Sequence, residues 1–298
     1  MLGPEEDTGM RRLVLSLLIV LAAIVVVPLL GARVLGWGSN PAAVPPVAKQ
    51  VAIGGGRALN VLDLGEGPPV VLVHGLPSSI GDWAEVPHKL AELGHRVVVY
   101  DRVGYGHSSR DDASSSDAYT YASNVRDLGA LLDALGIRSA TLAGWSYGGA
   151  VVQEFAVEHP ERAPQVAFIG SVGPASTEDE DALSKILHSG AGEEILRWAG
   201  AVSPVGGAFT RENLRMAFAR ERDVPPGFEE RTRAMLALPG TLEAFVAESQ
   251  RSDPSSLEPE RIAAPAVVLH GTEDLLVPLA VGQDLDRRLP ASQILIVP

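Results

Sequence analysis

Segments with two different hydrophobic periods alternate through most of this chain. Apolar residues at helical spacing predict a helix over Tyr119–Leu135: Val125, Leu128, Leu131, Leu132 and Leu135. The same spacing predicts a second helix over Ala150–Ala163. Between such segments stand apolar runs of strand length, at 69–73, 96–100, 139–143, 165–172, 265–270 and 293–297. The alternation indicates one α/β domain.

The first and last parts of this domain show other patterns. Val51–Ile53 and Ala58–Leu64 flank three consecutive glycines, and we expect an opening β-hairpin there. From about Pro174 to Ala264 the chain has helical patches and turn residues without a clear strand. This span, 174–264, is therefore predicted to be an insertion. The final run, 293–297, predicts a strand buried on both faces.

The N-terminal region contains a separate apolar segment. Leu13–Ala32 is twenty residues long and carries no charge. A helix of that length spans about 30 Å, the thickness of a bilayer core. Arg11 and Arg12 precede it, which favours a cytoplasmic N-terminus and a domain on the extracytoplasmic side. A cleaved signal peptide is the alternative to this membrane anchor.

These patterns divide the chain into three parts. Residues 1–35 are predicted to form a cytoplasmic stub and a transmembrane helix. Residues 36–50, rich in glycine, proline and alanine, are predicted to be a linker, and residues 51–298 the α/β domain.

The amino-acid composition excludes several classes of site and partner. The chain has no cysteine, so disulfides, thiolate metal sites and a cysteine nucleophile are excluded, as fits a bacterial protein exported without disulfides. Its net charge of −13 argues against a nucleic-acid partner. The triple glycine at 54–56 lacks the lysine and following helix of a phosphate loop, and the acidic run 178–181 is interpreted as solvated rather than as a calcium loop. We expect no cofactor and no metal.

One serine has the setting of a catalytic nucleophile. Ser146 lies in the sequence Gly-Trp-Ser-Tyr-Gly-Gly, directly between a predicted strand and a predicted helix. A nucleophile at such a strand-to-helix turn is exposed, and the N–H of the next residue, Tyr147, points toward an oxyanion from the positive end of the helix. We therefore predict Ser146 as the nucleophile and Tyr147 as an oxyanion-hole donor.

Two further segments extend this motif. An apolar strand runs into His74-Gly75-Leu76-Pro77, and a second strand runs into a Gly-x-Gly-x-Ser turn at 104–108. With the serine turn, these segments resemble the α/β-hydrolase family, in its serine-nucleophile, esterase- and lipase-like branch, from about Val51 to the last residue. The resemblance implies a mostly parallel sheet flanked by helices, with a helical cap at 174–264.

The same resemblance implies roles for two more residues. The backbone N–H of Leu76 would be the second oxyanion donor. Asp274, in the strand end His-Gly-Thr-Glu-Asp, would be the acid of the catalytic triad, because its Gly-x-x-Asp spacing fits better than that of Glu273.

The catalytic histidine is not found where the family order Ser…Asp…His puts it. No histidine follows Asp274, and the family's position falls a few residues beyond Pro298. His74 is interpreted as holding the oxyanion turn. We expect the chain as given to be an inactive and unstable fragment, cut before the histidine and before a final helix. Natural loss of the histidine, leaving a non-catalytic binding protein, is the alternative.

The predicted chemistry is acyl transfer to water. A serine rather than an aspartate at position 146 argues against epoxide hydrolase and haloalkane dehalogenase reactions, which this family carries out through a carboxylate. The expected function is a membrane-anchored serine hydrolase that acts on a small carboxylic ester or related acyl substrate. A cofactor-free perhydrolase or a carbon–carbon bond hydrolase with the same triad is the alternative.

Overall fold

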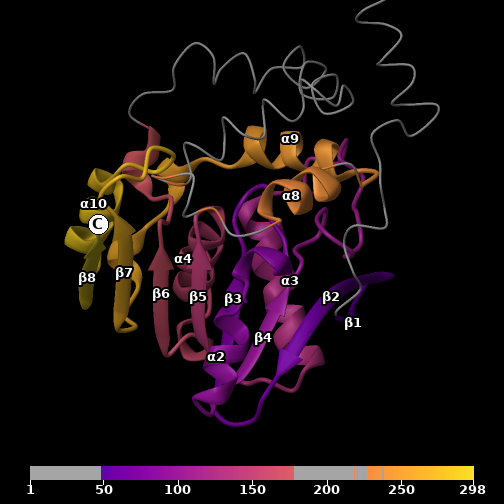
Figure 1. Ribbon diagram of the computed structural model, residues 1–298, viewed down its shortest axis with the longest axis horizontal. Coiled ribbons are helices and arrows are strands. Elements are labelled where there is room, and N and C mark those ends of the chain that lie inside the picture. Colours follow the sequence, from indigo (N-terminus) through magenta and orange to yellow (C-terminus); the bar gives the residue numbers. More distant parts are fainter. Residues whose placement is uncertain (1–47, 178–217, 219, 221–223, 225–226, 237) are drawn as a thin grey trace, which may run out of the picture.

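The computed structural model describes residues 48–177, 218, 220, 224, 227–236 and 238–298 (Figure 1). The predicted anchor, most of the predicted linker and most of the predicted cap lie outside these residues. Within the described ranges, no helix is both long enough and apolar enough to cross a bilayer.

The described residues form one sheet of eight strands, in the order β1-β2-β4-β3-β5-β6-β7-β8. The first two strands pair antiparallel with their neighbours, and all later pairs are parallel. The strands are β1 Lys49–Gly54, β2 Arg57–Leu64, β3 Pro69–Val73, β4 Arg96–Tyr100, β5 Thr141–Trp145, β6 Gln165–Ile169, β7 Ala266–Gly271 and β8 Ser292–Val297. The mostly parallel α/β sheet and the opening hairpin are confirmed.

Helices flank this sheet. The α-helices are α2 Val86–Glu92, α3 Tyr121–Ala134, α4 Tyr147–Glu158, α8 Phe228–Leu236, α9 Thr241–Arg251 and α10 Leu279–Arg288. Short 3₁₀ turns are η2 Ile80–Trp83, η3 Pro160–Arg162, η4 Pro174–Thr177, η6 Pro254–Ser256 and η7 Pro259–Arg261. The described part of span 174–264 contains helices and no strand, and α8 and α9 lie above the sheet in Figure 1.

Strand alternation divides the core between the two faces of the sheet. Val71 and Val73 pack with residues of α3, α4 and α10 in the larger core. Val70 and Leu72, whose side chains point the other way, pack with Trp83 and with α2 in the smaller one. Both faces of the central strands are therefore covered, as parallel strands require.

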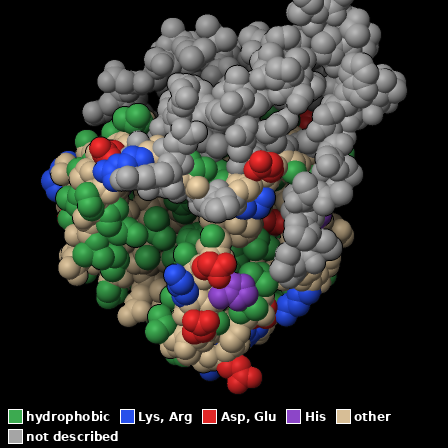
Figure 2. All heavy atoms as spheres, viewed as in Figure 1, with side chains coloured by type: hydrophobic (Ala, Val, Ile, Leu, Met, Phe, Trp, Pro, Cys, Tyr) green, Lys and Arg blue, Asp and Glu red, His purple; other side chains and the backbone are tan. Residues whose placement is uncertain are grey.

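The outermost parallel strand differs from its prediction. The sequence predicts burial of β8 on both faces, but Leu295, Ile296 and Val297 are 44–46% exposed. β8 is the last strand of the described sheet, and among its apolar residues only Ile294 packs against a core cluster of the described residues. Figure 2 shows the resulting apolar area, where hydrophobic side chains gather over β7 and β8.

Candidate active site

Ser146 occupies a sharp turn between β5 and α4. Its backbone angles are φ 53° and ψ −121°, a conformation that a residue with a side chain rarely adopts. Its N–H donates to the carbonyl of Ile169 at 3.0 Å, and its own carbonyl accepts from Gly149 N–H at 2.9 Å. The surrounding structure thus holds a strained serine in place, which is the geometry that a nucleophile elbow needs.

The glycines around Ser146 are needed for close packing. A Cβ on Gly144 would lie 2.3 Å from the carbonyl oxygen of Gly148, and one on Gly148 would lie 2.2 Å from that of Val73. A Cβ on Gly149 would lie 2.0 Å from Ser171 Oγ. The positive φ of this turn falls on the serine and not on these glycines. The glycines instead let α4 approach β3 and β5.

The turn after β3 lies against the serine side chain. A Cβ on Gly75 would be 3.6 Å from Ser146 Oγ, so the next peptide group, with the N–H of Leu76, borders the same space. Tyr147 is the first residue of α4, where backbone N–H groups have no partner within the helix. Neither N–H donates to another group in the described part of the chain. With respect to the described residues, both predicted oxyanion donors are therefore free.

Asp274 follows β7 in a tight turn. Its Oδ1 accepts hydrogen bonds from the N–H groups of Leu276 at 3.0 Å and Val277 at 2.9 Å. These bonds fix the carboxylate and leave Oδ2 to face another group. Glu273, the alternative acid, is exposed and lies 3.8 Å from Arg220 at the surface.

The end of strand β6 lies next to both Asp274 and Ser146. A Cβ on Gly170 would lie 3.2 Å from Asp274 Oδ2, while the preceding residue, Ile169, binds the N–H of Ser146 through its carbonyl. The two side chains thus border the same end of β6. The structure brings Ser146, Leu76, Tyr147 and Asp274 to one end of the sheet.

Family comparison agrees with this arrangement. The family described as alpha/beta hydrolase fold matches residues 68–298. The chain belongs to this family. The 2-hydroxy-6-oxo-2,4-heptadienoate hydrolase of Pseudomonas putida is 28% identical over 247 residues, which cover 82% of the chain and 86% of the relative. The 2-hydroxymuconate semialdehyde hydrolase of Pseudomonas putida is 28% identical over 255 residues, which cover 84% and 85%.

A solved structure shows the same likeness. The bromoperoxidase from Bacillus anthracis is 25% identical, with a TM-score of 0.68, and the match covers 84% of this chain and 91% of that protein. Together with the family match, these relatives confirm an α/β-hydrolase fold and an enzyme of hydrolase type.

His74 holds the turn that carries Leu76, the predicted oxyanion donor. Its Nε2 accepts the backbone N–H of Arg102 at 2.9 Å, so Nδ1 carries the proton and donates to the carbonyl of Gly75 at 2.9 Å. Burial, reinforced by the nearby Arg102 charge, lowers the pKa of His74 well below its usual value. A neutral imidazole whose two nitrogens are both hydrogen-bonded stabilises the turn and does not serve as a mobile base.

His270 has a similar structural role beside Asp274, the predicted acid. It is buried on β7, its Nε2 donates to the carbonyl of Val277 at 2.7 Å, and it lies 3.7 Å from Asp274 Oδ2. Its hydrogen bond to Val277 stabilises the turn that contains Asp274. Within the described ranges, no histidine is hydrogen-bonded to Ser146 Oγ.

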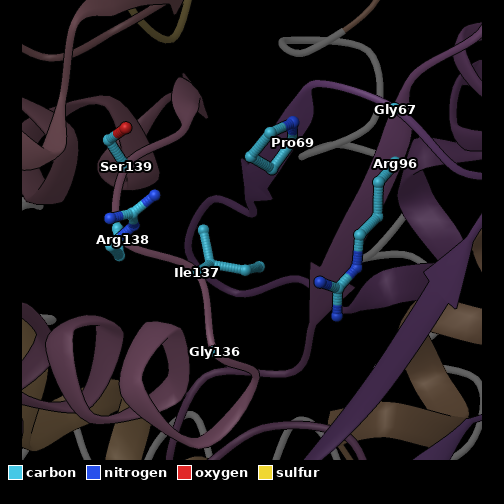
Figure 3. Close-up of a pocket in the computed structure, with 7 residues that line it drawn as sticks. All are labelled: Gly67, Pro69, Arg96, Gly136, Ile137, Arg138 and Ser139. Atoms are coloured by element: carbon cyan, nitrogen blue, oxygen red, sulfur yellow. The ribbon is translucent and has the colours of Figure 1, made fainter.

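A surface pocket of about 290 Å³ lies away from this site (Figure 3). Pro69 and Arg96 line it at the starts of β3 and β4, whereas Ser146 follows the end of β5. Arg96 binds Asp63 through two hydrogen bonds of 3.0 Å, so its charge is already paired. This pocket is no candidate for the acyl site.

Sequence reasoning missed a buried ion pair beside the oxyanion turn. Arg102, which follows β4, lies 2.5 Å from Glu248 of α9, and both side chains are 0% exposed. Arg102 precedes the Gly-x-Gly-x-Ser turn at 104–108 and is not part of that motif, and Glu248 lies in the span predicted to be the cap. The pattern around Glu248 is that of an ordinary amphipathic helix, so only the folded structure reveals the pair.

Proposed function

We propose that this hydrolase cleaves small carboxylic esters or related acyl compounds with Ser146 as nucleophile and Asp274 as triad acid. The base would be a histidine, which follows the acid in the family order Ser…Asp…His. The strained backbone of Ser146, facing the Gly75–Leu76 turn, is the observation that carries the proposal. Strain of this kind is kept where the surrounding structure holds a functional group in place.

Each group has a defined part in the reaction. Ser146 Oγ would attack the substrate carbonyl while the imidazole takes its proton, and Asp274 would orient that imidazole. The N–H groups of Leu76 and Tyr147 would stabilise the developing oxyanion, a contribution of about 3–4 kcal/mol for one donor. Water would then release the acyl group by the reverse sequence of proton transfers.

Carbon–carbon bond hydrolysis is a second candidate for the same site. Two relatives are named as hydrolases of 2-hydroxy-6-oxo-2,4-heptadienoate and of 2-hydroxymuconate semialdehyde. Both compounds contain a carbonyl that the site could polarise through Leu76 and Tyr147. Turnover of such a dienoate with no turnover of simple esters would favour this candidate. The likeness to a bromoperoxidase keeps perhydrolysis as a further alternative.

The nucleophile is tested by a matched pair of serine variants in the full-length gene product. Ser146→Ala should lower kcat/KM for p-nitrophenyl acetate by at least about a thousandfold, because removal of a triad member leaves only binding and the oxyanion hole. Ser139→Ala, which removes a hydroxyl at the opposite end of the strands, should leave turnover unchanged. Near-normal turnover by Ser146→Ala would contradict the assignment. Absence of turnover in the unaltered protein would favour a non-catalytic binding role.

We also propose that Leu13–Ala32 anchors the protein in a membrane, with the hydrolase domain on the extracytoplasmic side. The length and lack of charge of this segment support the anchor. A cleaved signal peptide would export the same domain without an anchor.

A further inference from the structure

The buried ion pair joins helix α9 to the loop after β4. Arg102 donates from Nη1 to Glu248 Oε1 at 2.5 Å and from Nη2 to Oε2 at 3.0 Å. The two carboxylate oxygens also accept from Tyr105 Oη at 2.7 Å and from Asn124 Nδ2 at 2.9 Å. Glu248 is thus fully hydrogen-bonded inside the protein.

The other donors of Arg102 reach the oxyanion turn. Its Nε donates to the carbonyl of His74 at 3.2 Å, and its Nη2 donates to the carbonyl of Gly75 at 2.9 Å. The guanidinium also lies 4.6 Å from the ring centre of Tyr147, the residue after the nucleophile. One side chain therefore contacts both segments that carry the predicted oxyanion donors.

The bond to Gly75 fixes the direction of a catalytic donor. The carbonyl of Gly75 and the N–H of Leu76 belong to the same planar peptide group, and in a trans peptide they point in opposite directions. Two hydrogen bonds to this carbonyl, from Arg102 and from His74 Nδ1, hold the plane in one orientation. The N–H of Leu76 is then held in the opposite direction without a hydrogen bond of its own to any described residue.

Stability alone gives little reason for such a pair. An ion pair buried in a protein is often no more stabilising than apolar residues of the same size, although removal of one partner alone is strongly destabilising. Burial acts to lower the pKa of Arg102, but the charge and hydrogen bond of Glu248, together with Tyr105 and Tyr147, outweigh burial and raise the pKa, so the guanidinium stays charged. An arginine can contact a carboxylate and two carbonyls at once because its donors form a planar fork.

The geometry points to Arg102 and Glu248 as positioning residues of the oxyanion hole: Glu248 orients the guanidinium, and Arg102 orients the Gly75–Leu76 peptide. The catalytic part of this inference rests on the proposed function. The positional part concerns the turn itself and can be measured without a substrate.

Two variants separate positioning from stability. Arg102→Lys keeps the charge beside Glu248 but cannot hold both carbonyls with one planar group. The double variant Arg102→Gln with Glu248→Gln removes both charges together, so neither is left buried alone. Arg96→Lys is the matched control, because Arg96 also binds a carboxylate in two places but lies at the other end of β4.

Amide hydrogen exchange of residues 74–79 in the full-length gene product is the first measurement. Exchange there should rise by about tenfold or more in both test variants, with strands β3 to β5 unchanged, and Arg96→Lys should match the unaltered protein. Unchanged exchange at 74–79 would overturn the proposal. A rise spread evenly over the whole chain would also overturn it, since it would show a general structural role.

Ester kinetics are the second measurement. We expect kcat to fall by about tenfold to a hundredfold with little change in KM, because the oxyanion donor acts mainly in the transition state. Normal kcat in both variants would overturn the catalytic part. If the unaltered protein hydrolyses no ester, the proposed function fails, while the exchange experiment still decides whether the pair positions the turn.

Discussion

Asp127 shows how burial changes one residue's titration. This carboxylate of α3 is 6% exposed and lies 2.9 Å from Arg57 Nη2. Burial raises its pKa from 3.8 to about 6, although the charge of Arg57 acts in the opposite direction. The folded protein therefore binds a proton here that the unfolded chain releases at a lower pH.

The sign of the resulting pH dependence follows from linkage. Because the folded protein binds the Asp127 proton more tightly than the unfolded chain does, protonation of Asp127 stabilises the fold. This stabilisation is complete below about pH 3.8 and is lost as the pH rises through about 6. The loss is at most about 3 kcal/mol, at about 1.4 kcal/mol per pKa unit. The free energy of unfolding should therefore decrease between pH 4.5 and 7.5, in part because Asp127 loses its proton. We expect Asp127→Asn, which cannot titrate, to remove that part of the decrease when unfolding is measured with urea.

Asp63 provides a control of opposite sign. Its hydrogen bonds to Arg96 lower its pKa, so its stabilisation is present above about pH 3.8 and is lost as the pH falls further. Asp63→Asn should therefore weaken the protein at neutral pH and reduce its loss of stability in acid. Parallel pH profiles for Asp127→Asn and the unaltered protein would contradict the assignment to Asp127.

Single residues with a local signal could be predicted, and those with distant partners could not. Ser146 and Asp274 lie at strand ends within short motifs, so the sequence indicates where they lie before any contact is known. Arg102 and Glu248 are 146 positions apart, and no local pattern shows that their side chains meet. Hydrogen bonding between distant segments is a property of the folded chain.

Among the elements, β7 tests how burial alternates along one strand. Val268 is fully buried in the larger core, whereas its neighbour Val267 is 38% exposed on the opposite face. Val268→Thr should lower the free energy of unfolding by about 1–3 kcal/mol, because it buries a hydroxyl without a partner. Val267→Thr should change it by less than about 0.5 kcal/mol. Urea denaturation of the two variants is the measurement.

Comparing Val267→Thr with Val268→Thr also tests whether the apolar face of β7 and β8 is exposed in the whole protein. Equal losses for the two valine variants would show that another part of the protein covers Val267. Unequal losses would show that the apolar area over β7 and β8 is open to solvent in the whole protein.

Element boundaries were less predictable than the elements. The sequence places the strand before Ser146 at 139–143, but β5 is Thr141–Trp145, because Gly144 and Trp145 pair with Phe168 and Ile169 of β6. Helix α4 ends at Glu158, before Pro160, rather than at Ala163. Proline disfavours helical backbone in the residue before it, so this end could have been predicted.

For the whole molecule, the membrane anchor remains a prediction, since Leu13–Ala32 lies outside the described residues. The full-length gene product should stay in the membrane fraction after carbonate washing, and deletion of residues 1–35 should release it. A variant with both Leu21→Arg and Ile24→Arg should also be released, because each arginine costs about 2.5–3.5 kcal/mol at the centre of a spanning helix. A mature N-terminus located after residue 32 would show a cleaved signal peptide instead.

The overall fold was predictable as a class but not as a topology. The hydrophobic periodicity and the short motifs predict an α/β architecture, because both depend only on residues that are close in the sequence. The position of β4 between β2 and β3 depends on which backbones pair, and nothing local specifies it. The exposure of β8 is also a property of the assembled sheet, since its sequence is as apolar as that of a central strand.

The link between Arg102 and Glu248 constrains how such hydrolases can be recombined. A chimera that replaces residues 174–264 with those of a relative exchanges Glu248 but keeps Arg102. If the donor segment has no carboxylate at that place, a guanidinium is left buried without its counter-charge, at a cost of about 3–5 kcal/mol. The two positions therefore have to be inherited together, although one follows a strand of the sheet and the other belongs to the segment predicted to form the cap.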